Sequence, residues 1–398
     1  MPRPSHPPIG LYVHVPFCVS KCAYCDFTSY AAREAEMPRY VETVVREIAR
    51  RGVETGHPKA DTIFLGGGTP SLLDESQVAR ILDALFEAFA VEEGAEITCE
   101  CNPGTLGTSD RAPGGPHPRP LFQRERGVAT STFAQTLRSA GVNRLSLGAQ
   151  VSQTPLLRLL GRIHDWDQVV ASVETAREAE FENINLDLMF GLPSQTAADF
   201  RETLEAATAL EPTHLSCYGL IVEEATPICR DIASGRLALP EEDAEREMYE
   251  LARQMLAEHG FQQYEISNFA REGYACRHNL GCWTRVPYLG FGCAAHSFFD
   301  ECRTRNPATL DAYLAGKEPK TERISKEEAR FESLMLGLRM TRGVKDEDFL
   351  RMHGMSIREA FGEKLDKPIA AGLLQWHEGA LRLTRLGMDL QNTVLVDL

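Results

Sequence analysis

One feature constrains the fold of this chain more than any other: from residue 10 to about residue 265, short apolar runs alternate with longer amphipathic segments. Strands that alternate with helices build a parallel sheet, because each connection has to cross back over the sheet. The expected strands are 11–14, 62–65, 96–101, 144–147, 184–189 and 214–218, and the expected helices are 40–51, 75–89, 133–140, 166–179 and 198–210. Six such repeats predict an α/β fold, a partial (β/α)6 barrel of the TIM type.

The remaining sequence predicts a smaller second unit. We expect the partial barrel over residues 1–270, a connecting segment over 271–324 and a C-terminal domain over 325–398. In that domain, helical patterns at 327–339 and 357–371 precede a hairpin with a Glu378-Gly379 turn, an order that resembles a winged helix. Residues 107–127 are rich in Pro, Gly and Arg without periodicity, so we expect an inserted surface loop.

Composition and charge exclude several function classes. The chain has no apolar run of about 18 residues, and its first ten residues resemble neither a secretion signal nor a presequence. We therefore expect a cytoplasmic protein with at most transient membrane contact. A net charge of −15 argues against general binding of nucleic acid, and the C-terminal domain is balanced, with 11 Lys and Arg against 12 Asp and Glu. Eleven cysteines without a secretion signal indicate a reducing compartment, where clustered thiols bind metals.

Three cysteines, Cys18, Cys22 and Cys25, lie within eight positions of one another. Structural zinc requires four ligands, so His14 or Asp26 would have to complete the set, and this alternative stays open. An iron–sulfur cluster takes thiolate ligands, and three thiolates on four irons leave one iron free to bind a small molecule. The favoured interpretation is a [4Fe–4S] cluster with one open iron.

The CxxxCxxC spacing at the end of the first expected strand resembles the radical S-adenosylmethionine superfamily. In that superfamily the open iron binds the amino and carboxylate groups of S-adenosylmethionine, and a glycine-rich loop after the second strand, here FLGGGTPS, contacts its methionine part. An acid, an amide, a guanidinium and a second acid at later strand ends suit the charged groups and ribose of that ligand. By this resemblance, to the coproporphyrinogen dehydrogenase-like branch, the contacts are Tyr12, Gly67, Gly68, Thr69, Glu100, Gln150, Arg162 and Asp187.

Two kinds of protein in this branch imply different functions. The oxygen-independent coproporphyrinogen dehydrogenase is a radical enzyme that decarboxylates two propionates, whereas the other kind is a heme chaperone. The enzyme has a fourth cysteine two positions after the third, whereas this chain has Phe27 at that position. The enzyme also has an extension before the cluster strand, whereas only about ten residues precede that strand here. The resemblance therefore favours a heme chaperone that delivers heme to an acceptor, respiratory or other, with the enzyme as the alternative. It also implies that the cluster serves dimerisation or regulation, so a homodimer is expected.

The motif HNLGCW at 278–283 resembles the HNxxYW motif of the chaperones, with Cys282 at the tyrosine position. Neutral imidazole is a common ligand of heme iron, so His278 is the expected axial ligand, and Trp283 would pack on the macrocycle. Cys282 adds a second soft ligand candidate. Four other histidines lack such a motif and are expected to be structural, namely His164, His296, His353 and His377.

Overall fold

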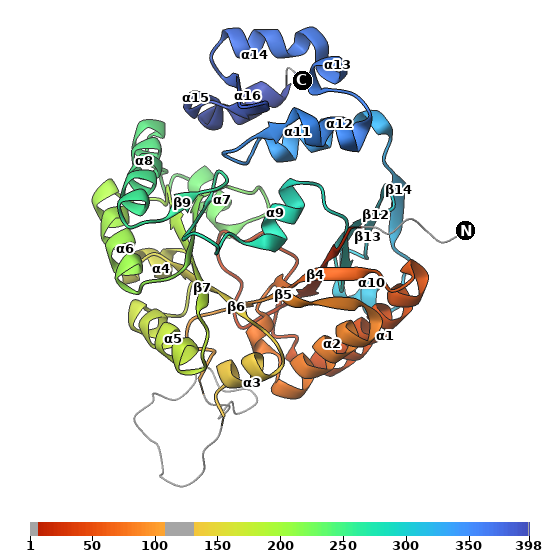
Figure 1. Ribbon diagram of the computed structural model, residues 1–398. Coiled ribbons are helices and arrows are strands. Elements are labelled where there is room, and N and C mark those ends of the chain that lie inside the picture. Colours follow the sequence, from red (N-terminus) through yellow and green to blue (C-terminus); the bar gives the residue numbers. More distant parts are fainter. Residues whose placement is uncertain (1–6, 108–130, 397) are drawn as a thin grey trace.

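The computed structural model describes residues 7–107, 131–396 and 398 (Figure 1). The expected surface loop at 107–127 lies, except for Gly107, outside the described residues. No helix in the described part of the chain combines the length and apolarity needed to cross a bilayer.

A twelve-stranded sheet forms the centre of the molecule. Seven neighbouring strands are parallel, and antiparallel strands extend the sheet at both edges, so the barrel is open. In sheet order the strands are β14 (Lys320–Arg323), β13 (Cys302–Arg305), β12 (His296–Phe299), β11 (Tyr288–Phe291), β1 (Ile9–Val15), β4 (Lys59–Gly67), β5 (Ala90–Cys101), β6 (Arg144–Gln150), β7 (Asn183–Phe190), β8 (His214–Gly219), β10 (Asn268–Ala270) and β9 (Gln262–Gln263).

The six expected strands are all confirmed, as β1, β4, β5, β6, β7 and β8. The seventh parallel strand, β11, comes from the segment at 271–324, and β12 to β14 of the same segment continue the sheet beyond it. This segment is therefore largely part of the sheet edge. Its strands have four residues each, too few for a period of two to stand out in the sequence.

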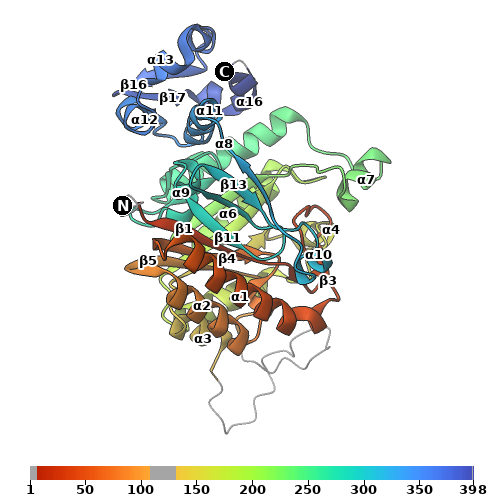
Figure 2. The same ribbon diagram turned by 90° about the vertical axis from the view of Figure 1, so that its right-hand side faces the viewer.

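The helices pack along the outside of the open barrel (Figures 1 and 2). The five expected ones are confirmed as α1 (Met37–Thr55), α2 (Glu75–Ala88), α3 (Phe133–Ser139), α5 (Trp166–Glu178) and α6 (Ala197–Ala209). Capping boxes begin α2, α3, α5 and α6, since the side chain before each helix accepts a bond from its third residue. Five more helices occur before the C-terminal unit: α4 (Thr154–Leu159), α7 (Pro227–Ala233), α8 (Glu242–Glu258), α9 (Arg277–Trp283) and α10 (Leu310–Leu314).

The barrel strands bury apolar side chains on their helix side and polar side chains on the inside. Ile63, Leu145 and Leu186 have no exposed surface and belong to the apolar core. At the alternating positions, Glu100 of β5 stands opposite Ser146 of β6, and other polar residues face one another across β6, β7 and β8. TIM barrels are usually filled by branched apolar residues. A polar interior is costly unless it binds something, so it marks the inside of this barrel as the binding region.

The C-terminal unit has its own apolar core and lies at the opposite end of the molecule from α1 to α3 in both views (Figures 1 and 2). Its expected first helix is α11 (Lys326–Gly337), and its hairpin pairs β16 (Leu374–His377) with β17 (Ala380–Leu383). Glu378 and Gly379 have φ of +49° and +76°, as a tight two-residue hairpin turn requires. The remaining elements are β15 (Val344–Lys345), α12 (Asp346–His353), α15 (Arg385–Asp389) and α16 (Gln391–Val396).

The expectation of one continuous helix at 357–371 is wrong. The segment divides into α13 (Ile357–Phe361), the 3-10 turn η3 (Gly362–Leu365) and α14 (Asp366–Ala370). Gly362 has φ of +57°, which ends α13, because an α-helix requires negative φ at every residue.

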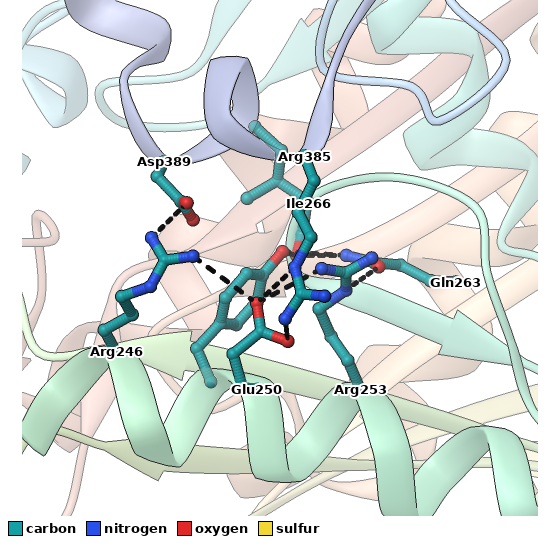
Figure 3. A network of polar contacts seen from close by, with 8 residues as sticks. Arg246, Glu250, Arg253, Gln263, Ile266, Arg385 and Asp389 are labelled. Atoms are coloured by element: carbon teal, nitrogen blue, oxygen red, sulfur yellow. Dashed lines mark hydrogen bonds and ion pairs between the residues drawn. The ribbon is translucent and has the colours of Figure 1, made fainter.

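A polar network holds the C-terminal unit on the barrel (Figure 3). Glu250 of α8 forms ion pairs with Arg385 of α15 and, at 3.3 Å, with Arg253. Arg246 of α8 pairs with Asp389 at the other end of α15. Most of these side chains are partly exposed, so each pair contributes little by itself, but together the pairs fix the position of α15 on α8.

Candidate functional site

The three cysteines lie in a loop that the structure closes at both ends. The short strands β2 (Phe17–Cys18) and β3 (Tyr30–Ala31) pair in parallel, so the loop leaves β1 and returns beside its own start. The amide of Ala23 donates to the carbonyl of Leu160 at 2.9 Å, and the amide of Ile228 donates to the carbonyl of Ala23 at 2.9 Å. These bonds hold the loop, with its three free, half-buried thiols, against α4 and α7.

Side chains from outside the cysteine triplet donate hydrogen bonds to the sulfurs. Thr69 Oγ1 donates to Cys18 Sγ at 3.6 Å, and Arg162 Nη1 donates to Cys22 Sγ at 3.5 Å. Burial raises the pKa of the Cys18 and Cys25 thiols, so these thiols are neutral until a metal displaces their protons. Donors aimed at the sulfurs and a cation beside them suit an iron–sulfur cluster, whose thiolates bring negative charge into the loop.

Among the described residues, no group of three or more His, Cys, Asp or Glu side chains is arranged to hold a metal ion. The choice between a cluster and a zinc ion therefore rests on the groups around the sulfurs, and the guanidinium of Arg162 beside Cys22 suits the several negative thiolates of a cluster.

The glycine-rich turn after β4 brings backbone close to β1. Gly67 has φ of +106°, and a Cβ on it would lie 2.3 Å from His14 Nδ1. A Cβ on Gly68 would lie 2.6 Å from the carbonyl oxygen of Val15. Both positions therefore require glycine, and the amide of Gly67 is left free to donate to Glu100 Oε2 at 2.9 Å.

Arg162 connects the cysteine loop to the strand ends. Its Nη2 donates to Asn102 Oδ1 at 2.7 Å and to the carbonyl of Gly148 at 2.8 Å, and Asn102 Nδ2 donates to Thr69 Oγ1 at 2.9 Å. Arg162 Nε is buried without a hydrogen-bond partner among the described residues. A buried unpartnered donor is costly, so this guanidinium has capacity for one more acceptor, such as a ligand carboxylate.

Two carboxylates face the interior beside this chain of bonds. Burial and, to a smaller extent, the charge of nearby Asp187 raise the pKa of Glu100 to about 7, although the hydrogen bond from the Gly67 amide opposes the rise. Burial also raises the pKa of Asp187, against hydrogen bonds from Asn185 at 2.9 Å and Ser146 at 3.1 Å. Two acids held close together in a desolvated space favour a cationic ligand, and S-adenosylmethionine carries an ammonium and a sulfonium.

Tyr12 and Gln150 complete the predicted set. Tyr12 shares a hydrogen bond of 2.9 Å with His14 Nδ1, and burial raises the pKa of its phenol, so it remains a neutral hydroxyl. Gln150 has φ of +64° where the register between β6 and β7 shifts, and its amide points back to Gly148. The eight predicted S-adenosylmethionine contacts thus lie on the inner faces of the strands and in the adjoining loops, and Thr69 and Arg162 among them contact the cysteines directly.

Sequence analysis missed Asn102, Ser146 and Asn185. Asn102 bridges Thr69 and Arg162, while Ser146 and Asn185 fix the carboxylate of Asp187. A signal was present, because polar residues occur at the alternate positions 96, 98 and 100 of β5 and again at 102, directly after the strand. A strand that is polar at every second position, with apolar residues between, has a polar inner face.

His278 lies deeper in the barrel and apart from the other predicted site residues. Its Nδ1 shares a hydrogen bond of 2.9 Å with Thr62 Oγ1, and its ring packs on Phe64 with centroids 5.1 Å apart. Phe64 in turn packs on Tyr12 at 6.2 Å, so one aromatic ring separates His278 from the predicted cofactor residues. Burial lowers the pKa of His278 to about 4, which keeps the imidazole neutral. A cavity of about 210 Å³ adjoins it.

Helix α9, which carries the HNLGCW motif, is fixed at its start by Glu96 of β5. The amides of Arg277 and His278 donate to the Glu96 carboxylate at 3.0 and 3.1 Å, an arrangement favoured at a helix N-terminus. At the other end, the guanidinium of Arg339 lies 4.5 Å from the ring centre of Trp283, and burial raises the pKa of Cys282 to about 11. Cys282 is therefore a neutral thiol in this state.

The partial barrel carries a three-cysteine loop after its first strand, and acids, an amide and an arginine lie at later strand ends. These features together define a protein of the radical S-adenosylmethionine class. In agreement, residues 12–207 match the family described as "Radical SAM superfamily", and residues 324–390 match "HemN C-terminal domain".

Close relatives extend over almost the whole chain. A protein of Bacillus subtilis named heme chaperone HemW is 36% identical over 390 residues, covering 96% of this chain and 97% of its own. The heme chaperone HemW of Escherichia coli K12 is 33% identical, and the match covers 98% of this chain and 97% of the relative. The HemW of Synechocystis is 38% identical, and the match covers 85% of this chain and 79% of the relative. The chain belongs to the HemW family of radical S-adenosylmethionine proteins.

Among solved structures, the coproporphyrinogen III oxidase HemN of Escherichia coli, described as a radical SAM enzyme, matches all of this chain and 91% of its own with a TM-score of 0.79. At 23% identity the match shows a shared fold. The expected fold and branch are therefore confirmed, whereas the individual site residues stay predictions.

Proposed function

We propose that this protein is a heme chaperone, which binds heme and transfers it to an acceptor heme protein. The observation that carries the proposal is the similarity, over 96 to 98% of the chain, to relatives from distant bacteria that are named heme chaperones. Phe27 supports it from the sequence, because the decarboxylating enzyme has a cysteine at that position. The acceptor, respiratory or other, the homodimer and the cytoplasmic location belong to this proposal.

In the proposed state, Cys18, Cys22 and Cys25 hold a [4Fe–4S] cluster, which supplies an open iron to S-adenosylmethionine. The residues around it have separate roles. Arg162 balances thiolate charge and presents its free Nε to the ligand carboxylate, while Glu100 and Asp187 receive its cationic and ribose groups. The Gly67 turn leaves room for the ligand next to Tyr12 and His14, and Gln150 and Thr69 line the same strand ends.

Anaerobic reconstitution tests both parts on one sample. We expect close to four irons and four sulfides per chain, a change in the cluster spectrum when S-adenosylmethionine is added, and a Soret band that saturates on titration with hemin. Zinc in place of iron, or no Soret change, would contradict the proposal.

The alternative is a radical enzyme that acts on a porphyrinogen, which the fold shared with HemN favours. Incubation without oxygen with coproporphyrinogen, S-adenosylmethionine and a reductant separates the two functions. We expect no loss of carboxyl groups by mass spectrometry, whereas stoichiometric decarboxylation would establish the enzyme.

His278 remains the heme ligand that the motif predicts. His278 as a residue is only 8% exposed, so ligation there requires α9 to move away from Glu96. His278→Ala should shift the Soret band if it binds the iron. His377→Ala, at a half-exposed histidine of the β16 strand, is the matched control.

A further inference from the structure

Helix α9 forms one wall of the cavity beside His278, and α11 of the C-terminal unit lies next to this helix in both views (Figures 1 and 2). Residues 280–282 of α9 line the cavity, and so does Arg342, which follows α11 in the chain. The cavity volume of about 210 Å³ is below the roughly 300–1,000 Å³ of pockets that hold ligands of drug size. A ligand as large as heme therefore cannot reach His278 while α9 keeps this position.

The end of α9 is held by Arg339, which follows α11. The guanidinium of Arg339 lies 4.5 Å from the ring centre of Trp283, the last residue of α9. Its Nη2 also donates to Glu265 Oε2 at 3.2 Å, and the Glu265 side chain has no exposed surface. A cation between a Trp ring and a buried carboxylate meets little competing water, so Arg339 holds the end of α9 against the barrel.

A second contact from α11 holds Arg285, two residues after α9. Arg285 Nε donates to Glu332 Oε2 of α11 at 3.2 Å, and the guanidinium lies 4.2 Å from the ring centre of Phe298. Arg285 also pairs with Glu301 at the sheet edge, at 3.0 Å. The side chains of Arg285 and Glu332 are only 5% and 14% exposed, so water screens their pair weakly. The C-terminal unit therefore grips two neighbouring positions at the exit of α9.

We propose that Glu332 and Arg339 form a latch, through which the C-terminal unit keeps α9 closed over His278. Two features favour opening once the latch is released. Positive φ at Arg285, +58°, is costly for a residue with a side chain, and the indole Nε1 of Trp283 is buried without a hydrogen-bond partner among the described residues. That opening admits heme rests on the proposed heme chaperone function, whereas the latch itself is tested without heme.

Alkylation of Cys282 measures how often α9 opens. This cysteine lies in α9 and lines the cavity, and burial raises the pKa of its thiol to about 11, so it reacts slowly while the helix is closed. The full-length protein with its cluster is treated with N-ethylmaleimide without oxygen, and mass spectrometry of the tryptic peptide 278–285 gives the rate. This peptide contains no other cysteine. Cys217, buried in β8, reports global unfolding in the same sample.

Arg339→Gln and Glu332→Gln should each raise the alkylation rate of Cys282 about tenfold, because each removes a charged contact that holds only the closed helix. Arg339→Lys keeps a cation beside the Trp283 ring and should stay close to the parent rate. The matched control is Arg385→Gln, which breaks an ion pair of the C-terminal unit with Glu250 of α8, away from α9. It should react like the parent.

A parent-like rate in both latch variants would exclude the latch. An equal rise in Arg385→Gln would also exclude it, because the whole C-terminal unit would then have loosened. If Cys217 becomes reactive in one latch variant, that variant has unfolded and the other decides.

Hemin titration of the same proteins separates the latch from the proposed function. If hemin binds, Arg339→Gln should show a lower apparent Kd than the parent, because more of the variant is open. A parent that binds no hemin contradicts the proposed function, but the alkylation rates still decide the latch.

Discussion

Glu100→Gln should raise the unfolding free energy of the ligand-free protein at alkaline pH. The same substitution should weaken the binding of S-adenosylmethionine. Burial and Asp187 raise the pKa of Glu100 from 4.5 to about 7. A carboxyl group whose folded pKa is raised contributes stability below pH 4.5, and this contribution is lost as the pH rises to about 7. Ionisation of Glu100 therefore destabilises the fold, and a glutamine cannot ionise.

The magnitude follows from the two pKa values. The rise from 4.5 to about 7 corresponds to about 3 kcal/mol, at about 1.4 kcal/mol per pH unit. The side chain is partly exposed at the barrel mouth, where water screens the charge, so we expect about 1–2 kcal/mol. Glutamine keeps an oxygen that accepts from the Gly67 amide, although a neutral acceptor forms a weaker bond by about 1 kcal/mol.

Urea unfolding of the cluster-containing protein at pH 5.5 and pH 8 measures the effect. The difference in unfolding free energy between Glu100→Gln and the parent should shift in favour of the variant by about 1 kcal/mol between the two pH values, because part of the contribution is already lost at pH 5.5. Other titrating groups cancel in this difference. Glu93→Gln, at an exposed position of β5, should show no such shift. A difference that does not depend on pH, or one that falls toward pH 8, would refute the assignment of Glu100 as a strained acid.

Three further outcomes are expected. Cys22→Ser should lose the iron and sulfide of the cluster, because a hydroxyl is a poor ligand for it, but should still bind hemin; loss of both would mean that the two sites are not separate. Gly67→Ala should cost about 2–4 kcal/mol of unfolding free energy, since strain at positive φ adds to a contact of 2.3 Å with the ring of His14. Gly94→Ala, which has positive φ but open space, should cost about 1 kcal/mol, and equal costs would disprove the contact argument. Asp187→Ala should weaken S-adenosylmethionine by about 1.5–3 kcal/mol in calorimetry, and an unchanged affinity would remove it from the site.

Local patterns in the sequence were sufficient for much of this structure. Alternating apolar runs located the six barrel strands, because burial on the helix side imposes a pattern that is visible within a few residues. The Glu378-Gly379 turn was equally local, since two consecutive positive φ values select a few residue types. The spacing of Cys18, Cys22 and Cys25 indicated the cluster because three ligands in one loop need no distant partner.

Tertiary structure decided which distant segments meet. Only the fold places β11 beside β1, brings Arg162 to the sulfur of Cys22 140 positions earlier, and sets Glu96 under the start of α9. Likewise, only the packing of the C-terminal unit on the barrel brings Arg385 to Glu250 and Asp389 to Arg246. The physical reason is that periodicity and turn chemistry record how each residue meets its immediate surroundings, whereas contacts across the chain depend on how all the elements pack together.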